Sequence, residues 1–326
     1  MPVPAVHRVV IDEGSEGQRL DNFLVKLLKG VPKTHVYRVI RSGEVRVNKG
    51  RAAADTRLAL GDEVRVPPVR VADRSELPPA PPREFAVVFE DEHLMAIDKP
   101  AGVAVHGGSG VSFGVIEQLR RARPTAKFLE LVHRLDKETS GLLLIAKRRS
   151  ALVALQEQLR VHTGEKVIGK SYAALVIGAW PASKKVIDVA LHKVLSVEGE
   201  RRVHAVGDAH EAGRRSITLV KVAQRFGGYT LLDVTIKTGR THQIRVHLAH
   251  AGHAIAGDPK YGDFDMNRRL ARGEALPGGQ RLGRMFLHAR RLRFAHPASG
   301  EAVELEAPLP AECAAALAAL RRGTPP

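Results

Sequence analysis

The residues best suited to chemistry lie in one polar stretch, His133-Arg134-Leu135-Asp136-Lys137-Glu138-Thr139-Ser140-Gly141. The apolar run Leu142-Leu143-Leu144-Ile145-Ala146 follows at once and is long enough for a buried strand. A polar loop held beside buried strands is a rigid platform for reactive side chains. The carboxylate of Asp136 could act there as a nucleophile or as an anion that stabilises a developing positive charge. Taken alone, the stretch could equally be an ordinary polar connection.

Histidines gather further along the chain and suggest a zinc site as an alternative. His247 and His250 lie three residues apart on a presumed helix, between His242 and His253. Zinc sites usually add cysteine or a carboxylate at a recognised spacing, as in His-Glu-x-x-His, and the sequence offers neither here. Cys313 is the only cysteine and lies in an Ala-rich segment, so no intrachain disulfide can form. We therefore expect no metal.

A serine hydrolase is a further alternative, because His106-Gly107-Gly108-Ser109-Gly110 is similar to a hydrolase oxyanion loop. Such enzymes present their nucleophile on a Gly-x-Ser-x-Gly elbow. That elbow is missing: Val111 stands two residues after Ser109, and Glu138 stands two residues before Ser140. We expect the glycines instead to let the backbone turn tightly or approach a binding partner.

The composition is strongly basic. Among 326 residues there are 51 Lys and Arg against 35 Asp and Glu, a formal net charge of +16 with a pI near 10.3. This excess favours a polyanionic partner, most commonly nucleic acid, although a merely basic soluble protein would show the same balance. No apolar run reaches the roughly 18–20 residues that span a bilayer. Residues 1–7 lack the basic start and apolar core of a signal peptide, so we expect a cytoplasmic protein.

The elements that must position these residues begin with a small N-terminal module. Apolar residues at three- and four-residue spacing predict one helix over 20–28 and a second over 36–40 that stops at Gly43. Alternating valines then lead to a turn at Asn48-Lys49-Gly50, and a strand over 64–66 closes a small sheet.

Basic side chains surround the second helix and the turn after it. For any one of them, a solvated face is a sufficient explanation. Together with Arg19-Leu20-Asp21, the run Ile40–Asn48 and Leu60-Gly61-Asp62-Glu63-Val64, they resemble the S4 RNA-binding module. The resemblance implies RNA contacts through Lys33, Arg38, Arg41, Arg46, Lys49 and Arg51.

Six prolines between Pro67 and Pro82 indicate an extended, semi-rigid linker. We therefore expect an S4-like α/β domain over 17–75, a linker over 76–84 and a second domain over 85–326. The second domain should carry helices near 116–119 and 152–159 and strands near 87–89, 94–97, 172–177, 229–236 and 291–294. Because strands follow one another directly, we expect an α+β fold with a mostly antiparallel mixed sheet flanked by helices and loops.

The polar stretch and four further blocks, in order along the chain, resemble the RluA-type pseudouridine synthases. His133-Arg134-Leu135-Asp136 followed by Glu138-Thr139-Ser140-Gly141 is similar to the family's signature. The other blocks are Asp91–Leu94 with Asp98–Gly102 and His106–Gly110, then Lys170–Val176, then Gly239-Arg240-Thr241-His242-Gln243-Ile244-Arg245-Val246-His247-Leu248, and finally Phe286–Ala289 with His296-Pro297.

The resemblance assigns roles residue by residue. The family's catalytic aspartate falls on Asp136, its active-site tyrosine on Tyr172 and its basic partner on Arg245. Arg134 matches the arginine that fills the space left by an extruded base. The implied reaction is the isomerisation of uridine to pseudouridine in 23S ribosomal RNA, without a cofactor, by a monomer that meets free RNA or an assembling large subunit. The segments 164–169 and 265–283 follow no pattern of the family.

These residue types suit that reaction. The N1–C1′ bond must break and a C5–C1′ bond must form, which one ionised carboxylate can assist. Arg245 would keep the Asp136 carboxylate ionised if Thr241 caps a short helix that runs to Ala251 and ends at Gly252. A stacked uridine has to flip out to reach Asp136. The alternative from another class is a non-catalytic RNA-binding or ribosome-assembly protein on the same fold, which would be marked by loss of the aspartate.

Overall fold

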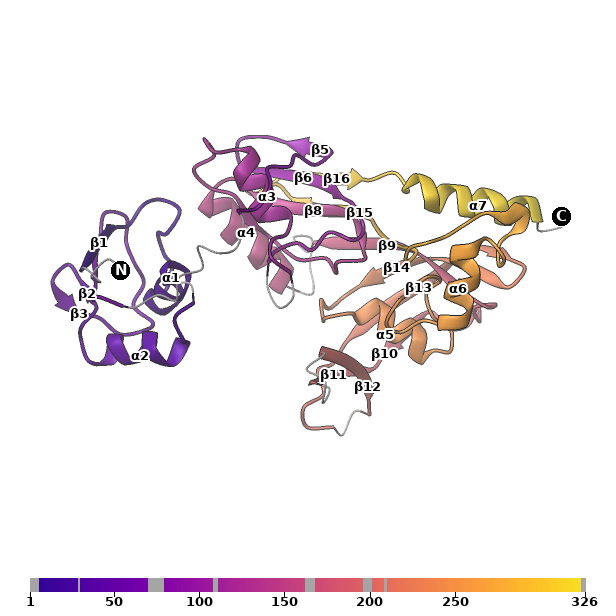
Figure 1. The fold of residues 1–326 in the computed structure, drawn as a ribbon, viewed down its shortest axis with the longest axis horizontal. Coiled ribbons are helices and arrows are strands. Elements are labelled where there is room, and N and C mark those ends of the chain that lie inside the picture. Colours follow the sequence, from indigo (N-terminus) through magenta and orange to yellow (C-terminus); the bar gives the residue numbers. More distant parts are fainter. Residues whose placement is uncertain are drawn as a thin grey trace.

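The described strands form a small sheet near the N-terminus, one large sheet and a separate two-stranded hairpin (Figure 1). The structure is a computed structural model and describes residues 6–28, 30–69, 79–107, 111–161, 168–195, 201–207 and 210–323. Within these residues, no helix is long and apolar enough to cross a membrane.

The small sheet is antiparallel, in the order β1-β4-β2-β3, and two helices pack on it. Its core consists of the apolar faces of both helices and of the strands, including Leu20, Leu24, Val36 and Val64. The elements are β1 (His7–Val10), α1 (Leu20–Leu27), α2 (Lys33–Arg41), β2 (Arg46–Val47), β3 (Gly50–Arg51) and β4 (Glu63–Val66).

The turn between β2 and β3 holds two non-glycine residues in the left-handed region, Asn48 at φ 48° and Lys49 at φ 69°. A two-residue hairpin turn needs this geometry at both positions. The Asn48 side chain supports it, since its amide donates to Asp62 Oδ1 at 2.7 Å and its carbonyl oxygen accepts from the Glu63 N–H at 2.9 Å. The Lys49 side chain is therefore presented at the tip of a fixed turn.

The large sheet runs β10-β13-β14-β9-β15-β8-β6-β5, with β16 added to β15 and β7 to β8. All of these described pairs are antiparallel except β8 with β15. The strands are β5 (Val87–Glu90), β6 (Leu94–Lys99), β7 (Glu130–Leu131), β8 (Ser140–Ala146), β9 (Gly169–Ile177), β10 (Val186–Asp188), β13 (Ile217–Phe226), β14 (Tyr229–Ile236), β15 (Leu287–Ala295) and β16 (Ala302–Glu306).

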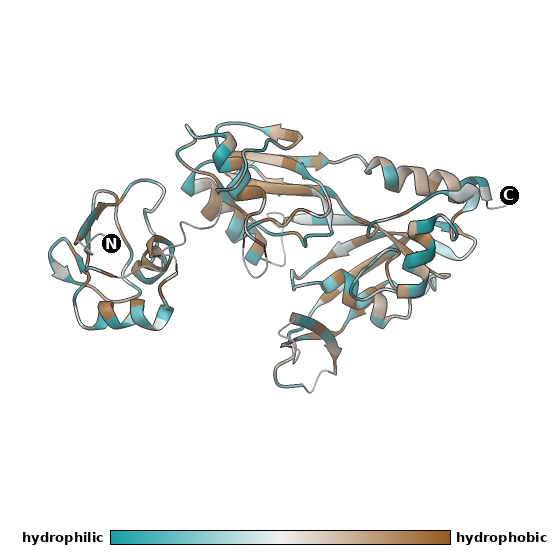
Figure 2. Cartoon of the chain, viewed as in Figure 1, coloured by the Kyte–Doolittle hydropathy of each residue, from teal (hydrophilic) through white to brown (hydrophobic). Residues whose placement is uncertain are grey.

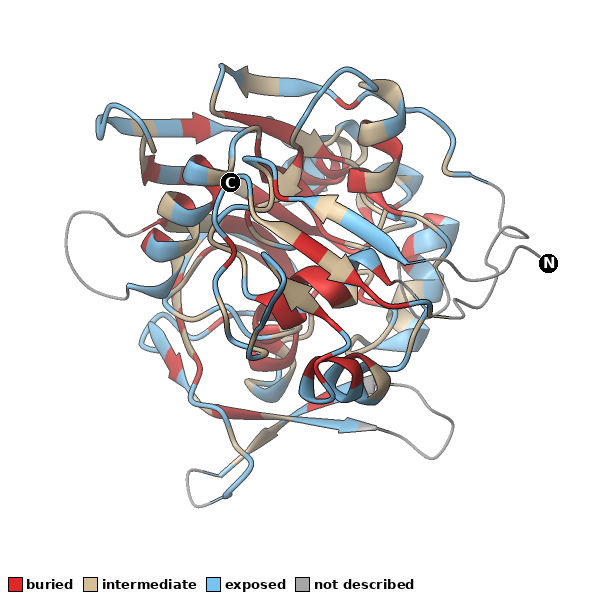
Figure 3. Cartoon of the chain, turned by 90° about the vertical axis from the view of Figure 1, so that its left-hand side faces the viewer, coloured by how far each residue is buried: buried red, intermediate tan, exposed pale blue. Residues whose placement is uncertain are grey.

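Helices and one separate hairpin pack around this sheet. The hairpin pairs β11 (Ala190–Leu195) with β12 (Arg201–Val206) and projects beside α5 (Figure 1). Buried residues gather on the strands in the middle of the molecule (Figure 3), and β6 and β8 are among the most hydrophobic elements (Figure 2). The helices are α3 (Val115–Ala122), α4 (Arg149–Arg160), α5 (Gln243–His250), α6 (Phe264–Arg272), the short 3₁₀ turn Pro277–Gly279 and α7 (Ala311–Gly323).

The parallel contact between β8 and β15 depends on Gly141, which has φ 110°. A Cβ at this position would lie 2.3 Å from the Ala289 carbonyl oxygen, so only glycine lets the strands approach. Gly141 also ends the polar stretch that contains Asp136. The close approach of β15 therefore fixes the point at which that stretch enters the sheet.

The expected α+β class with a mostly antiparallel sheet is confirmed. No element was predicted from the sequence at β1, β7, the run from β10 to β13, β16, α6 or α7. Helix α6 overlaps the segment 265–283, which matched no family pattern. The domain bounds at 17–75, 76–84 and 85–326 remain a prediction. Residues 70–78, which include the first three residues of the expected linker, lie outside the described part, as do 108–110 in the glycine-rich stretch and 164–167 in the segment 164–169.

Candidate active site

Asp136 lies in the loop between β7 and β8, and backbone hydrogen bonds hold that loop in place. The Thr139 N–H donates to the Asp136 carbonyl at 3.1 Å, and the Gly102 N–H donates to the Lys137 carbonyl at 2.8 Å. The loop that carries Asp136 is therefore held by one hydrogen bond within the loop and by another to the turn after β6.

The buried side chain of Lys99 strengthens this tie. Its Nζ donates to the carbonyls of Pro100 and Val103 at 2.8 Å and to that of Lys137 at 3.2 Å. Burial lowers the pKa of Lys99 to about 7. The three carbonyl acceptors match the three N–H bonds of the protonated side chain. Lys99 thus joins the turn after β6 to the Asp136 loop.

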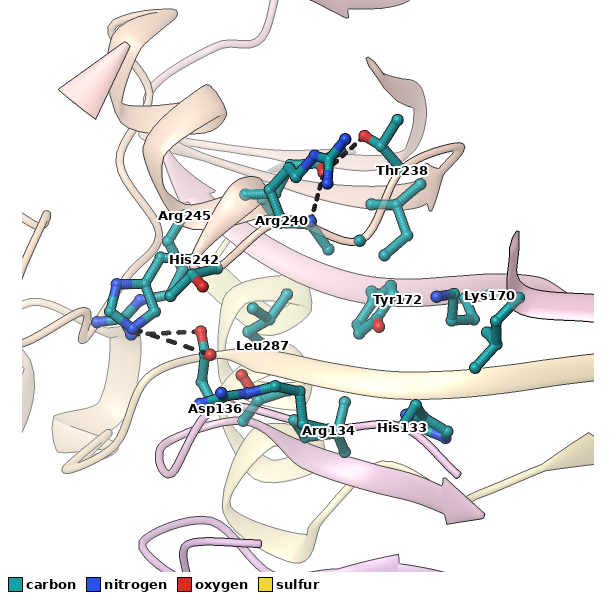
Figure 4. Close-up of a pocket in the computed structure, with 18 of the residues that line it drawn as sticks. His133, Arg134, Asp136, Lys170, Tyr172, Thr238, Arg240, His242, Arg245 and Leu287 are labelled. Carbon is teal, nitrogen blue, oxygen red and sulfur yellow. Dashed lines mark hydrogen bonds and ion pairs between the residues drawn. The ribbon is translucent and has the colours of Figure 1, made fainter. Parts of the chain in front are cut away.

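A pocket of about 470 Å³ opens above the loop (Figure 4). Its size falls within the range of small-molecule and nucleotide sites. Asp136 is the only carboxylate among its described lining residues, whereas several cationic side chains surround it. The basic members are Arg134, Arg160, Lys170, Arg240 and Arg245, together with His133 and His242.

Arg245 bridges two carboxylates. Its Nε and Nη2 donate to Asp258 Oδ2 and Oδ1 at 2.8 and 2.7 Å, and its Nη1 lies 3.5 Å from Asp136 Oδ2. The side chains of Arg245 and Asp258 are 4% and 1% exposed, so this charge pair is removed from solvent. Asp258 therefore holds Arg245 in place beside Asp136, and this partner was not predicted from the sequence.

The electrostatics of the Arg245–Asp258 pair favour its charged form. Burial acts to lower the pKa of Arg245, but the hydrogen bonds and charge of Asp258 outweigh it and the pKa is raised. Burial likewise acts to raise the pKa of Asp258, and Arg245 outweighs it, so that pKa is lowered. Backbone N–H groups of Lys260 and Tyr261 also donate to Asp258 Oδ1, at 2.8 and 3.0 Å.

Helix α5 is held rigidly where it carries Arg245. Gln243 Nε2 donates to the Ile217 carbonyl and to Thr218 Oγ1, both at 3.0 Å. His247 Nδ1 lies 2.9 Å from the same hydroxyl, and its Nε2 lies 3.1 Å from the Val189 carbonyl. These bonds fasten α5 to β13, and they give His247 a structural explanation without a metal.

The expected cap at Thr241 is wrong. The N-cap residue of α5 is His242, which lies in the left-handed region at φ 54° and makes no side-chain capping bond. Its ring instead turns toward Asp136, with Nε2 at 3.9 Å from Oδ1, and its Nδ1 lies 2.7 Å from the Tyr261 hydroxyl. The helix end at Ala251 and the Gly252 that follows agree with expectation.

Tyr172 lies on β9 with its ring in the pocket wall, close to Leu287 (Figure 4). The residue is 7% exposed and belongs to the main apolar core. Burial, followed by the charge of Asp136, raises the pKa of its hydroxyl, which stays protonated. Within the described residues, that hydroxyl has no hydrogen-bond partner and is free to meet a ligand.

Arg134 is exposed and lines the same pocket from the Asp136 loop. The structure therefore brings Asp136, Tyr172, Arg245 and Arg134 together around one cavity (Figure 4). Sequence reasoning missed Asp258, His242, Tyr261 and Lys170 as site residues. Lys170 stands two positions before Tyr172 on β9, and burial lowers its pKa.

The six basic residues of the S4-like module lie between residues 33 and 51, whereas the described residues of the pocket begin at His133. Five are exposed and Arg46 is half-buried. In the described part of the chain, no carboxylate lies within 4.0 Å of any of the six, so their charge faces solvent. Gly43 lets the Arg51 side chain pass, because a Cβ there would meet Arg51 Nε at 2.8 Å. The set comprises Lys33, Arg38, Arg41, Arg46, Lys49 and Arg51.

The arrangement suits chemistry at a glycosidic bond that uses one carboxylate and does not use water. A single carboxylate, 18% exposed and oriented by a buried arginine, faces a cation-rich cavity with an aromatic wall. Hydrolysis of a glycosidic bond normally uses two carboxylates that admit water between them. Here the second carboxylate, Asp258, is fully engaged by Arg245.

Comparisons with known proteins agree with this geometry. Residues 93–250 match the family described as RNA pseudouridylate synthase, and residues 18–64 match the S4 domain. The chain is 49% identical to ribosomal large subunit pseudouridine synthase C of Yersinia pestis over 98% of this chain and 97% of that protein. It is also 49% identical to the protein of the same name from Escherichia coli K12, over 94% of each.

Solved structures give the same result for the large sheet. Human RNA pseudouridylate synthase domain containing 4 aligns with a TM-score of 0.58 at 25% identity, over 72% of this chain and 93% of that one. Human RNA pseudouridylate synthase domain containing 1 aligns with a TM-score of 0.53 at 25% identity, over 74% and 97%.

Proposed function

Because this chain belongs to the RNA pseudouridylate synthase family and is an RNA pseudouridine synthase, we propose that it acts on large-subunit (23S) ribosomal RNA with Asp136 as its catalytic carboxylate. The substrate is proposed from the relatives from Yersinia pestis and Escherichia coli, whose names specify the large ribosomal subunit. One observation carries the assignment of Asp136: it is the only carboxylate among the described pocket residues, and Arg245 orients it.

The reaction breaks the N1–C1′ bond, turns the uracil and joins C5 to C1′, after which the proton leaves C5 and N1 gains one. An ionised carboxylate can assist as a nucleophile at C1′ or at C6, or by supporting a glycal route. All three need the charge of Asp136, which Arg245 stabilises from 3.5 Å. None needs a metal or another cofactor.

Tyr172 and Arg134 complete the proposed site. The ring of Tyr172 offers a flat face against which the detached uracil can stack. Its raised pKa keeps the hydroxyl protonated, so it can donate a hydrogen bond to the uracil, and it could take up the C5 proton only after losing its own. The uridine must leave its stack to reach Asp136. Arg134, on the exposed side of the loop, is placed to fill the space that the base vacates.

We propose that the six S4-like cations bind the RNA backbone outside the reacting nucleotide. The proposal is supported by the absence of carboxylate partners for these cations in the described part of the chain, so their charge is available to phosphates. The enzyme is proposed to work as a cytoplasmic monomer on free RNA or on an assembling subunit. Sedimentation at assay concentration checks the monomer.

The direct test uses large-subunit ribosomal RNA transcribed with tritium at C5 of uridine. Release of tritium to water is expected from the wild-type chain, and carbodiimide-induced stops of reverse transcription should map the product. Native RNA from cells that lack the gene is the control substrate. If the chain binds this RNA and releases no tritium from it, the non-catalytic RNA-binding alternative replaces the proposal.

A further inference from the structure

His242 and Tyr261 form a polar contact beside Asp136 that the roles described so far leave unused. Asp136 Oδ2 faces Arg245, whereas its other oxygen, Oδ1, faces His242 Nε2 at 3.9 Å. The opposite ring nitrogen, His242 Nδ1, lies 2.7 Å from the Tyr261 hydroxyl. The two oxygens of the Asp136 carboxylate therefore face two different residues near the start of α5, Arg245 and His242.

The hydrogen bonds around Tyr261 favour one tautomer of His242. The Val203 N–H donates to the Tyr261 hydroxyl oxygen at 3.1 Å, so the hydroxyl proton is available for His242 Nδ1. Burial lowers the pKa of His242 and raises that of Tyr261, so His242 is neutral and Tyr261 protonated near neutral pH. A neutral imidazole that accepts at Nδ1 carries its proton on Nε2, and that N–H faces Asp136.

The same tyrosine connects the site to the β11–β12 hairpin. Val203 belongs to β12, and its side chain packs with Leu191 of β11 and Val246 of α5 in one apolar cluster that Tyr261 joins. The Tyr261 ring also lies 5.1 Å beneath the Arg245 guanidinium. Tyr261 therefore contacts both residues that face Asp136.

We propose that His242 is a positioning residue for Asp136 and that the Tyr261 hydroxyl fixes the orientation of its ring. The Nε2–H of His242 faces Asp136 Oδ1 from 3.9 Å, and catalytic contacts that are long without substrate tighten when it binds. With Arg245 at the other oxygen, the carboxylate is then held at both oxygens. This inference rests on the proposed role of Asp136.

Three single variants separate this role from a structural one. Tyr261→Phe removes the hydroxyl but keeps the ring contacts with His242 and Arg245. His242→Gln keeps an N–H donor near the Nε2 position. His242→Asn provides a donor that is too short to reach Asp136, and asparagine tolerates the left-handed backbone at φ 54°. Tritium release is measured in single turnovers against enzyme concentration, which gives a rate constant and a half-saturating concentration separately.

We expect His242→Asn and Tyr261→Phe to lower the rate constant by about 10- to 100-fold, with the half-saturating concentration within about 2-fold of wild type. His242→Gln should recover most of the loss. In the double variant Tyr261→Phe/His242→Asn, the tyrosine change should cost nothing further, because both act through one contact.

The proposed action of Tyr261 on Asp136 through His242 is overturned if Tyr261→Phe reacts at the wild-type rate. It is also overturned if His242→Gln is as slow as His242→Asn, or if the rate losses of Tyr261→Phe and His242→Asn multiply in the double variant. Tyr261→Phe keeps its packing, so it provides a folded test even where a His242 variant is unstable. A wild-type chain that releases no tritium would refute the proposed function itself, which is a different result from an active wild type whose variants do not follow the pattern.

Discussion

Arg245 and Asp258 form a buried pair joined by two hydrogen bonds of 2.8 and 2.7 Å. The pair uses Nε and Nη2 of the guanidinium and leaves Nη1 directed at Asp136. A fork-to-fork contact of this kind fixes the plane of the guanidinium as well as its position. Arg245 is thus oriented before any substrate arrives, and it does not need to reorganise during the reaction.

The first prediction concerns stability. Arg245→Met leaves the Asp258 carboxylate buried without its partner, which typically costs about 3–5 kcal/mol. The double variant Arg245→Met/Asp258→Met should regain a large part of that loss, because no unpaired charge remains. Urea denaturation of the three proteins measures the difference. Equal stability of the two variants would mean that Asp258 is not held by Arg245.

The second prediction separates charge from geometry at Arg245. Arg245→Lys keeps the positive charge but loses the planar fork that binds Asp258 while reaching Asp136. We expect it to lower turnover strongly, and by less than Arg245→Met does. Single-turnover tritium release at a temperature where both variants are folded makes the comparison. Wild-type rates in both would show that Arg245 does not act on Asp136.

The third prediction concerns Asp136. Asp136→Asn keeps the side-chain volume and removes the negative charge, so activity should fall to background while folding and RNA binding survive. A gel-shift assay and a thermal melt serve as controls for binding and folding. Measurable turnover above background would rule out Asp136 as the catalytic carboxylate.

The fourth prediction concerns the N-terminal part. Deleting residues 1–75 should weaken binding to large RNA and leave the reaction on a short stem-loop, because Asp136, Tyr172 and Arg245 all come later in the chain. Each duplex phosphate contact contributes roughly 0.9 to the slope of log affinity against log salt. The truncated chain should therefore show a shallower slope. Equal slopes would show that the six S4-like cations do not contact phosphates.

The fifth prediction concerns pH and the buried His288, whose Nδ1 lies 2.9 Å from Ser140 Oγ. Burial lowers the pKa of His288 to about 4, whereas the unfolded chain titrates near 6.5. Between these values the unfolded state binds a proton that the folded state does not. Stability is therefore full above about 6.5 and falls on acidification toward 4, by up to about 1.4 kcal/mol per pH unit.

Urea denaturation from pH 7.5 to 4.5 tests this sign. His288→Gln should flatten the dependence between pH 6 and 5, even though the variant is less stable throughout. An unchanged slope in the variant would place the titration at other residues.

Local patterns were enough to predict the class of fold, because helical spacing and alternation are properties of short segments. The strand over 172–177 and the helix with Arg245 fall where the sequence placed them, within β9 and α5. Helix α6 was missed because most of its residues are polar and only Leu270 is buried, so it lacks the series of apolar residues by which the other helices were predicted.

The site was harder to predict than the fold. Asp258 stands 13 residues from Arg245, in the turn after Gly257, and nothing local marks it as a partner. The cap at Thr241 failed for a similar reason. The helix begins after His242, whose ring contacts Tyr261, 19 residues further along the chain, instead of capping the helix. Pairings across loops are tertiary facts that a single sequence does not encode in its spacing.

The parallel contact of β8 with β15 also has a consequence for how the chain folds. It pairs His288 with Ser140, so β8, which has β6 on its other side, gains this second neighbour only after more than a hundred intervening residues are made. Pairings of such high contact order are slow to form. During synthesis, the Asp136 loop is therefore complete while β15, one of the two strands beside β8, is still unmade.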